Sequence, residues 1–422
     1  MTVAAIRSLS ADQPSEKAPT RDGFQQTDLG LIPDDWQILP LDRTCRLVNG
    51  RGFKPFEWNT SGLPIIRIQN LNGSDEFNYY DGPYNKKIEI QTGQLLFAWS
   101  GSRGTSFGPH FWNGPLGLLN YHTWKIEAND NVVLARFLYH KLKQLTSEIE
   151  SWAHGASALV HVQKWQMEGF QIAIPICRKE QCAIAEALSD ADALIASLDA
   201  LISKKRDLKQ AAMQQLLTGK TRLPGFKGGW EEKSIDQLCR VDPDNLGANT
   251  PCTFSFNYIS LENVESGRLV GFTEMEFGNA PSRARRRLQP GDLLVSTVRP
   301  NLKAHLLFQN TSGDWVCSTG FSVLRPIHCQ SNSQFLFQHF FDRIINDQID
   351  KLIAGSNYPA ISSRDVKSLK LTVPRVEEQE AIASVLSDMH AEIAALEAKR
   401  DKARTVKQGM MQELLTGRIR LV

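Results

Sequence analysis

The sequence lacks several short motifs that often accompany catalysis. Its 422 residues contain no G-x-x-x-x-G-K-[ST] phosphate-binding loop, no G-x-G-x-x-G dinucleotide fingerprint and no H-E-x-x-H zinc motif. The Asn-Pro-Pro-aromatic motif of amino-methyltransferases is also missing, which argues against methyl transfer by this chain alone. The glycine-rich segment SGSRGTSFG, from Ser100 to Gly108, has the wrong spacing for a nucleotide fingerprint, and we interpret it as a surface loop. We therefore expect no catalytic residue and no cofactor of this chain's own.

Metal-binding and disulfide patterns are absent as well. The seven cysteines are scattered and odd in number, and none forms a C-x-x-C pair, which argues against both a zinc site and a disulfide framework. The nine histidines are dispersed, and we interpret the spacing of His154 and His161 as incidental. Scattered thiols suit a reducing compartment, so we expect a cytoplasmic protein without a bound metal.

Long apolar runs are missing too. No stretch of 18 apolar residues could form a membrane span, and the N-terminus lacks the basic and apolar regions of a secretory signal. Residues 1–26 are polar, and we expect a mobile tail there. The formal net charge is only +2, so a nucleic-acid surface would have to come from local basic clusters.

What the sequence does contain is a long internal repeat. Residues 181–223 and 379–421 align without a gap at a shift of 198 positions, with 24 of 43 residues identical. Weaker matches join GQLLFA (from Gly93) to GDLLVS (from Gly291), and HGASALV (from His154) to AGSNYPA (from Ala354). Such self-similarity indicates a tandem duplication. It predicts a tail at 1–26, a domain at 27–173, a helical segment at 174–223, a second domain at 224–372 and a second helical segment at 373–422.

The two domains have the pattern of a mixed α/β fold. Short apolar or alternating runs bounded by Gly, Pro and Asn predict strands at PIIRIQNL, GQLLFAW, FNYISLENV, GDLLVSTV and LKLTVP. Apolar residues spaced by three and four predict one amphipathic helix per domain, at 135–150 and at 333–350.

The repeated segments are the clearest helices. Apolar residues alternate by four and three without an interrupting proline, which is the pattern of a coiled-coil seam. The predicted seam consists of Ile184, Leu188, Ala191, Ile195, Leu198 and Ile202 in the first copy, and of Ile382, Leu386, Met389, Ile393 and Leu396 in the second. Gly219 and Gly417 are suited to end the helices. A helix of about 40 residues, roughly 60 Å long, needs a packing partner. Because each domain precedes its helix, antiparallel pairing of the two copies needs no long return and gives a pseudo-twofold symmetric molecule.

Local basic clusters are candidate contacts for nucleic acid, since arginine can read guanine edges and both arginine and lysine neutralise phosphate. The second domain offers Arg283, Arg285, Arg286, Arg287, Arg299 and Lys303, and the first offers Arg51, Lys54, Lys86, Lys87 and Arg103. A solvated strand face or turn is the alternative interpretation of each cluster.

The arrangement resembles the specificity subunit of type I restriction-modification systems. The resemblance extends from about residue 27 to 422 and rests on DLGLIPDDWQILPL (from Asp28), PGFKGGWEEKSIDQLC (from Pro224) and the two copies of EQ-x-AIA-x-x-LSD…KQ-x-x-MQ-x-LLTG-x-x-RL. The first copy has Cys182 where the second has Glu380.

The resemblance implies a fold class and a function. The two domains would be α/β target recognition domains, each reading one half of a split, asymmetric site in double-stranded DNA. The two helices would form an antiparallel coiled coil that separates the domains and docks two modification subunits. Those subunits would carry S-adenosylmethionine and methylate adenine, and restriction subunits using ATP and Mg would translocate and cleave unmodified DNA.

Three alternatives stay open at this point. The chain could serve a type IIB system, in which the partner fuses nuclease and methyltransferase. It could be an enzyme acting on DNA in its own right, or a coiled-coil scaffold that binds no DNA. A methyl-transfer assay on the isolated chain would test the second alternative. A DNA-binding assay with its partners would test the third.

Overall fold

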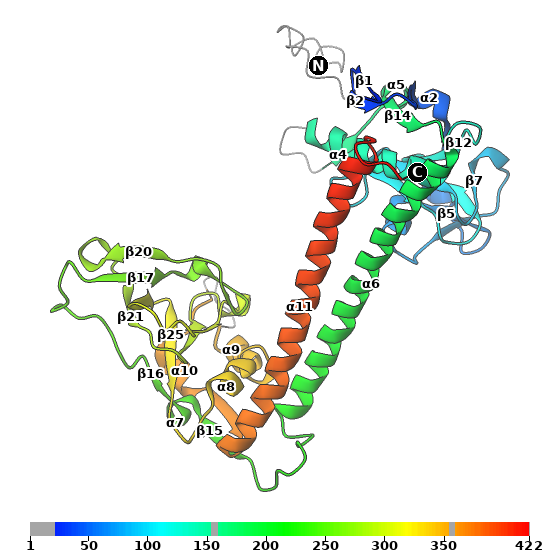
Figure 1. The fold of residues 1–422 in the computed structure, drawn as a ribbon. Helices are drawn as coiled ribbons and strands as arrows, with labels where there is room; N and C mark the ends of the chain where they lie inside the picture. The colour runs from blue at the N-terminus through cyan, green and yellow to red at the C-terminus, as the bar shows by residue number, and fades with distance from the viewer. Residues whose placement is uncertain (1–21, 153–158, 354–358, 422) are drawn as a thin grey trace. The chain divides into compact units, whose positions relative to one another are not determined.

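The computed structural model describes residues 22–152, 159–353 and 359–421, and its contacts separate the chain into two units. The first unit joins the chain up to Ser197 with the last segment from Arg400, and the second runs from Leu198 to Lys399. The division falls inside two long helices, α6 (Arg178–Leu216) and α11 (Val376–Leu414) (Figure 1). Each unit therefore contains one domain, the first half of one long helix and the last half of the other.

The domain of the first unit contains two four-stranded sheets. One has the strand order β10-β8-β12-β4, and the other has the order β6-β5-β11-β7. The strands of the first sheet are β4 (Cys45–Asn49), β8 (Leu95–Ala98), β10 (Gly108–Phe111) and β12 (Thr123–Ala128). Those of the second are β5 (Leu63–Ile66), β6 (Asn78–Tyr80), β7 (Glu89–Ile90) and β11 (Gly117–Leu119). Three further pairs are β1 (Phe24–Thr27) with β2 (Gly30–Pro33), β3 (Trp36–Pro40) with β14 (Gln171–Pro175), and β9 (Ser100–Ser102) with β13 (Leu159–His161).

The domain of the second unit repeats this topology. Its sheets have the orders β16-β25-β22-β23 and β20-β17-β24-β21. The strands are β16 (Cys239–Val241), β22 (Leu293–Ser296), β23 (Leu306–Leu307) and β25 (Phe321–Pro326), then β17 (Ser255–Ile259), β20 (Thr273–Glu276), β21 (Ala284–Arg287) and β24 (Trp315–Ser318). Separate pairs are β15 (Glu231–Ser234) with β26 (Lys370–Val373), and β18 (Val264–Glu265) with β19 (Arg268–Leu269). The equivalent pairs β5–β11 and β17–β24 are both parallel, so the duplication and the mixed α/β class are confirmed.

The helices of the two domains correspond less closely. The first unit has α2 (Leu41–Thr44), α3 (Ile68–Leu71), α4 (Ala135–Trp152) and α5 (Lys164–Gly169); the second has α7 (Ile235–Leu238), α8 (Ser333–His339), α9 (Arg343–Ile353) and α10 (Ser363–Ser368). The helix predicted at 135–150 is confirmed as α4, whereas the single helix predicted at 333–350 is wrong. The Asp342 carboxylate accepts the backbone N–H of Ile344, and the Asn346 side chain donates to the Phe340 carbonyl. These bonds replace helix bonds and start a new helix at Arg343.

Two predicted strands are shorter than their apolar runs. PIIRIQNL divides into β5 and α3, and FNYISLENV divides into β17 and a 3₁₀ turn at Leu261–Asn263. Both runs turn for the same reason: the side-chain oxygen of Asn70 accepts the backbone N–H of Arg67, and that of Asn263 accepts the N–H of Ser260. An asparagine that caps a turn thus competes with the strand. The predicted tail at 1–26 also ends inside β1, and its residues 1–21 lie outside the described part of the chain.

Within each unit, halves of the two long helices run antiparallel. In the first unit, Glu180 of α6 pairs with Arg420, and Asp192 farther along α6 pairs with Lys407 of α11. In the second unit, Lys205 pairs with Glu392 and Arg222 with Glu378, again with opposite directions along the chain. Gly219 and Gly417 follow the helix ends with φ of 68° and 72°, the left-handed conformation expected of terminating glycines.

Each helix begins with a buried carboxylate that is held by the other repeat. Glu180 is fully buried and accepts hydrogen bonds from Arg420 Nε (2.5 Å) and Nη2 (2.8 Å) and from Trp36 Nε1 (3.3 Å). Glu378 accepts two bonds of 2.5 Å from Arg222, whose guanidinium lies over the Trp230 ring. Glu180 and Glu378, like Arg222 and Arg420, are related by the 198-residue shift. The repeat therefore conserves the junction between domain and helices.

The next residue of each helix fixes the adjoining loop. The side-chain amide of Gln181 donates to the carbonyls of Val132 and Pro175 and accepts the N–H of Leu134. Gln379 makes the equivalent three bonds, to the carbonyls of Gln330 and Pro374 and from the N–H of Asn332. Both amides are fully buried, so each needs these partners to offset its desolvation.

The predicted seam lies against the domains as well as along the helix pair. Ile184 and Leu188 belong to the core of the first domain together with Leu414 and Leu415, and Ile382 and Leu386 belong to the core of the second. The remaining seam residues are buried or partly buried: Ala191, Ile195, Leu198, Ile202, Met389, Ile393 and Leu396. In the described part of the chain, no helix is both long and apolar enough to cross a membrane.

We expect the arginine of the junction to matter more than its carboxylate. Arg420→Met leaves a fully buried carboxylate without its cation and should lower the free energy of unfolding by about 3 kcal/mol. Glu180→Gln leaves an arginine that can turn to solvent and should cost about 1.5 kcal/mol. Urea unfolding of the full chain measures both values. The double variant should be more stable than Arg420→Met alone; equal losses in the two single variants would contradict the assignment.

Candidate nucleic-acid interface

Equivalent loops of the two domains carry predicted basic residues. In the first domain the chain leaves β8, forms β9 beside β13 and turns with Arg103 exposed. In the second domain the chain leaves β22, Val298 bridges to Ala360, and Arg299 donates its backbone N–H to Pro359. Both loops thus follow the Gly-x-Leu-Leu strand and run beside the chain that leads to the long helix. The matched residues 154–158 and 354–358 lie outside the described ranges.

The loop of the second domain has an unusual backbone. Arg299 and Lys303 adopt φ of 49° and 53°, the left-handed region, and they flank a 3₁₀ turn at Pro300–Leu302. Non-glycine residues rarely adopt this conformation, and such strain is concentrated at functional sites. Leu302 at this turn is 63% exposed, so an apolar tip stands between two cationic side chains.

The arginine run of β21 is not one open cluster. Arg286 is largely buried, forms an ion pair with Asp242 and donates to Ser363, so it has a structural role inside the second domain. Arg285 lies over the Phe277 ring, and Arg287 lies over Phe254 and donates to Asp314. Arg283, by contrast, has an exposed side chain. A contact of Arg283, Arg285 or Arg287 with DNA stays a prediction.

The candidates of the first domain separate in the same way. Arg51 lies over Phe53 and Tyr80 and forms an ion pair with Glu57, which ties it to the domain. Lys54, Lys86 and Lys87 are exposed. Sequence reasoning missed Phe56, which is 85% exposed in the turn Pro55–Glu57 beside Lys54. An aromatic residue next to lysine in a proline turn is a pattern that could have indicated this surface, since bases stack on exposed rings.

The glycine-rich loop of the first domain does not have the geometry of a nucleophile elbow. The segment Gly104-Thr-Ser-Phe-Gly108 has the G-x-S-x-G spelling of a nucleophile elbow, but it joins two strands, and Ser106 is buried with its oxygen accepting the N–H of Ser102. Among the described residues, no three His, Cys, Asp or Glu side chains are placed to hold a metal ion.

The family model described as the type I restriction modification DNA specificity domain matches residues 33–204 and 288–403. The chain belongs to this family. The matched ranges cover parts of both units and most of both long helices.

Relatives and solved structures agree with this membership. The chain is similar to the type I restriction enzyme MjaVIII specificity subunit of Methanocaldococcus jannaschii, with 22% identity over 92% of this chain and 94% of that protein. It is also similar to the EcoBI specificity subunit of Escherichia coli, with 27% identity over 45% of this chain and 40% of that protein. The S subunit structure from M. genitalium superposes with a TM-score of 0.59 at 15% identity, covering 90% of this chain and 96% of that one. That likeness shows the fold.

The structural role of Arg286 can be separated from DNA contact. Arg286→Ala should lower the stability of the second unit by about 2 kcal/mol, because Asp242 loses its cation in a largely buried position. The neighbouring Arg283→Ala should change stability by less than about 0.5 kcal/mol, because its side chain is exposed. Thermal unfolding of the two variants beside the parent chain checks this, and equal stability of Arg286→Ala and the parent would contradict the internal pairing.

Proposed function

We propose that this chain is the sequence-reading subunit of a type I restriction-modification complex and that its two domains read the two halves of a split DNA site. The observation that carries the proposal is the pair of equivalent loops after β8 and β22. The strand orders beneath these loops are the same, whereas the loops differ in residues and in backbone. Different loops on one scaffold suit a protein that must read two different sequences. Contacts to base edges determine which sequence is bound, whereas the scaffold holds the loops in place.

The long helices would set the number of unread base pairs between the half-sites. Each helix is continuous over 39 residues and passes from one unit into the other. The proposed docking of two modification subunits also has a candidate surface on α6. Leu201 and Leu208 of the second unit are spaced by seven residues and are 39% and 48% exposed. Exposed apolar side chains repeated on one helix face favour a protein contact.

The chemistry would belong to partner subunits. Modification subunits would supply S-adenosylmethionine and adenine methylation, and restriction subunits would supply ATP-dependent translocation and cleavage. A type IIB partner, which fuses nuclease and methyltransferase, fits the same chain equally well. The gene next to the one encoding this chain distinguishes the two systems.

Phosphate contacts by the loops are tested through the salt dependence of DNA binding. In complex with the modification partner, Lys303→Ala and Arg103→Ala should each make the slope of log affinity against log salt shallower by about 0.9 if each side chain neutralises one phosphate. Lys204→Ala is the control, because Lys204 is exposed on α6 and not on a domain loop. Unchanged slopes for both loop variants, or an equal change for the control, would contradict the proposed surface.

The spacing role predicts a change in the methylated motif. Four residues inserted into both helices, between Ser197 and Leu198 and between Lys399 and Arg400, add roughly 6 Å to each. At about 3.4 Å per base pair, the unread spacer should lengthen by at most about two base pairs with both half-sites unchanged. Sequencing of methylated sites in a host carrying the variant and its partner gives the result. An unaltered spacer would refute the role of the helices, and altered half-sites would refute the separation of reading from spacing.

A further inference from the structure

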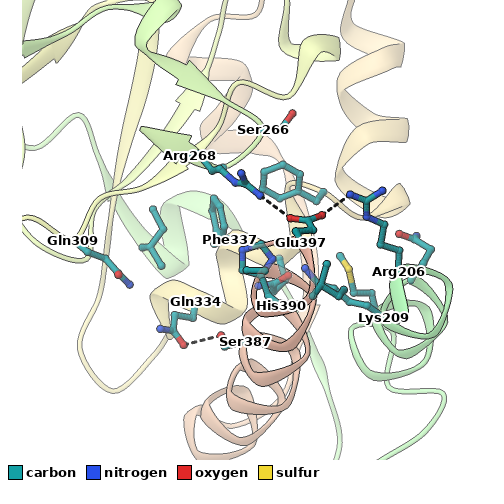
Figure 2. A pocket seen from close by; sticks show the side chains of 18 residues that line it. Arg206, Lys209, Ser266, Arg268, Gln309, Gln334, Phe337, Ser387, His390 and Glu397 are labelled. Atoms are coloured by element: carbon teal, nitrogen blue, oxygen red, sulfur yellow. Dashed lines mark hydrogen bonds and ion pairs between the residues drawn. The ribbon is translucent and has the colours of Figure 1, made fainter. Parts of the chain in front are cut away.

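The second unit contains a cavity of about 580 Å³. It lies among the β18–β19 hairpin, α8 and the parts of α6 and α11 that belong to this unit (Figure 2). Its apolar wall consists of Phe337, Phe341, Leu307, Met213 and Ile393. Its volume is within the range of roughly 300–1,000 Å³ that is typical of small-molecule sites.

The hairpin that closes one side of the cavity belongs to the second domain alone. Its turn places Ser266 and Gly267 at φ of 42° and 93°, and a Cβ atom on Gly267 would lie 3.2 Å from Phe337. The next residue, Arg268, reaches Glu397 of α11, which Arg206 of α6 reaches from another side (Figure 2). In the first domain, the chain between β5 and β6 forms α3 with no hairpin among the described strands.

The charge of the cavity is unbalanced. Arg206, Lys209 and Arg268 line it with one carboxylate, that of Glu397, and this carboxylate is already shared by the two arginines. Among the described residues, Lys209 forms no ion pair, and its burial lowers its pKa. Partial desolvation of His390, together with the neighbouring Lys209 and Arg268, also lowers the pKa of the imidazole. The lining thus has a net charge of about two positive units, with Lys209 uncompensated.

In the first unit, the lysine equivalent to Lys209 forms an ion pair. Lys407, the repeat equivalent of Lys209, pairs with Asp192 at 2.5 Å, and Lys143 approaches the same carboxylate at 3.6 Å. In the second unit His390 stands in place of Asp192, and Phe341 stands in place of Lys143. The second unit thus has the equivalent lysine but not the equivalent carboxylate.

A buried amide supplies a second, independent observation. Gln338 lines the cavity with only 7% of its surface exposed, and its side chain makes no hydrogen bond to any of the described residues. Its repeat equivalent, His140, bonds to Ser189. The equivalent serine of the second unit, Ser387, donates instead to Gln334, so Gln338 is left with a donor and an acceptor unused. The amide is among the groups that line the cavity, so it can contact a bound molecule.

We propose that this cavity binds a small organic phosphate in the size class of a nucleoside monophosphate. The phosphate, which carries about two negative charges at neutral pH, would replace the missing carboxylate beside Lys209 and come within reach of Arg206 and Arg268. The organic body would lie against the Phe337 and Phe341 wall, with a hydrogen-bonding edge on the Gln338 amide. This site is separate from the loops proposed to contact DNA and does not depend on that proposal.

The test is titration calorimetry on the full chain with AMP, adenosine and inorganic phosphate as probes. AMP should bind, and adenosine and phosphate should each bind at least about tenfold more weakly, because each lacks one half of the interaction. His390→Asp restores the internal anion of the first unit and should weaken AMP binding by about tenfold or more. His390→Asn, which adds no charge, should bind AMP as the parent does.

Two further variants keep the result interpretable. Gln338→Met preserves the shape of the side chain and should weaken AMP binding several-fold while the unfolding temperature stays close to that of the parent. Lys303→Ala alters the proposed DNA loop and should leave AMP binding unchanged. The proposal is overturned if AMP at millimolar concentration gives no heat, if phosphate binds as tightly as AMP, if His390→Asp binds AMP normally, or if Lys303→Ala removes the binding.

Discussion

At the start of each long helix, a buried carboxylate is neutralised by an arginine that follows the end of the other long helix. Glu180 with Arg420 and Glu378 with Arg222 make the same pair of short bonds in the two units. Because these arginines come from the opposite repeat, each buried carboxylate has its cation only when the end of the other helix lies alongside. The adjoining glutamines, Gln181 and Gln379, then fix the loop that leads into α4 or α8. Each domain is therefore joined to the helix pair through one polar junction that occurs twice.

Around this shared junction the two units have diverged in defined places. The loops after β8 and β22 differ in residues and backbone, and the β18–β19 hairpin has no counterpart between β5 and β6. Asp192 and Lys143 form ion pairs in the first unit, whereas their equivalents in the second unit, His390 and Phe341, line a cavity. Divergence affects the surfaces proposed to contact other molecules, whereas the residues that bind the helices to the domains are alike in the two units. Such a distribution would suit a protein whose two units bind the same kind of partner but different DNA sequences.

The repeat explains why so much of the fold could be predicted. Proline-free segments with apolar spacing of three and four predicted α6 and α11 closely, and the mixed α/β pattern predicted the strands β8, β22 and β26. The errors lie where one side chain overrides an apolar run: Asn70 and Asn263 turn two predicted strands, and Asp342 and Asn346 divide a predicted helix. The basic clusters were predicted by residue type alone. A sequence does not show that Arg286 faces an internal carboxylate, because the irregular pairing of β21 with β24 between Ala284 and Arg286 decides its direction.

The claim that each domain reads one half of the site is tested most directly by a chain that carries the second domain twice. In such a chain, residues 224–375 would replace residues 27–177, so that the junctions Glu180–Arg420 and Glu378–Arg222 are retained. The variant would be produced with its modification partner, and the methylated sites in the host genome would be mapped by sequencing. The account predicts a motif in which both halves are the half-site of the second domain, with the original first half absent. Methylation of the original motif, or a motif in which the first half persists, would contradict it.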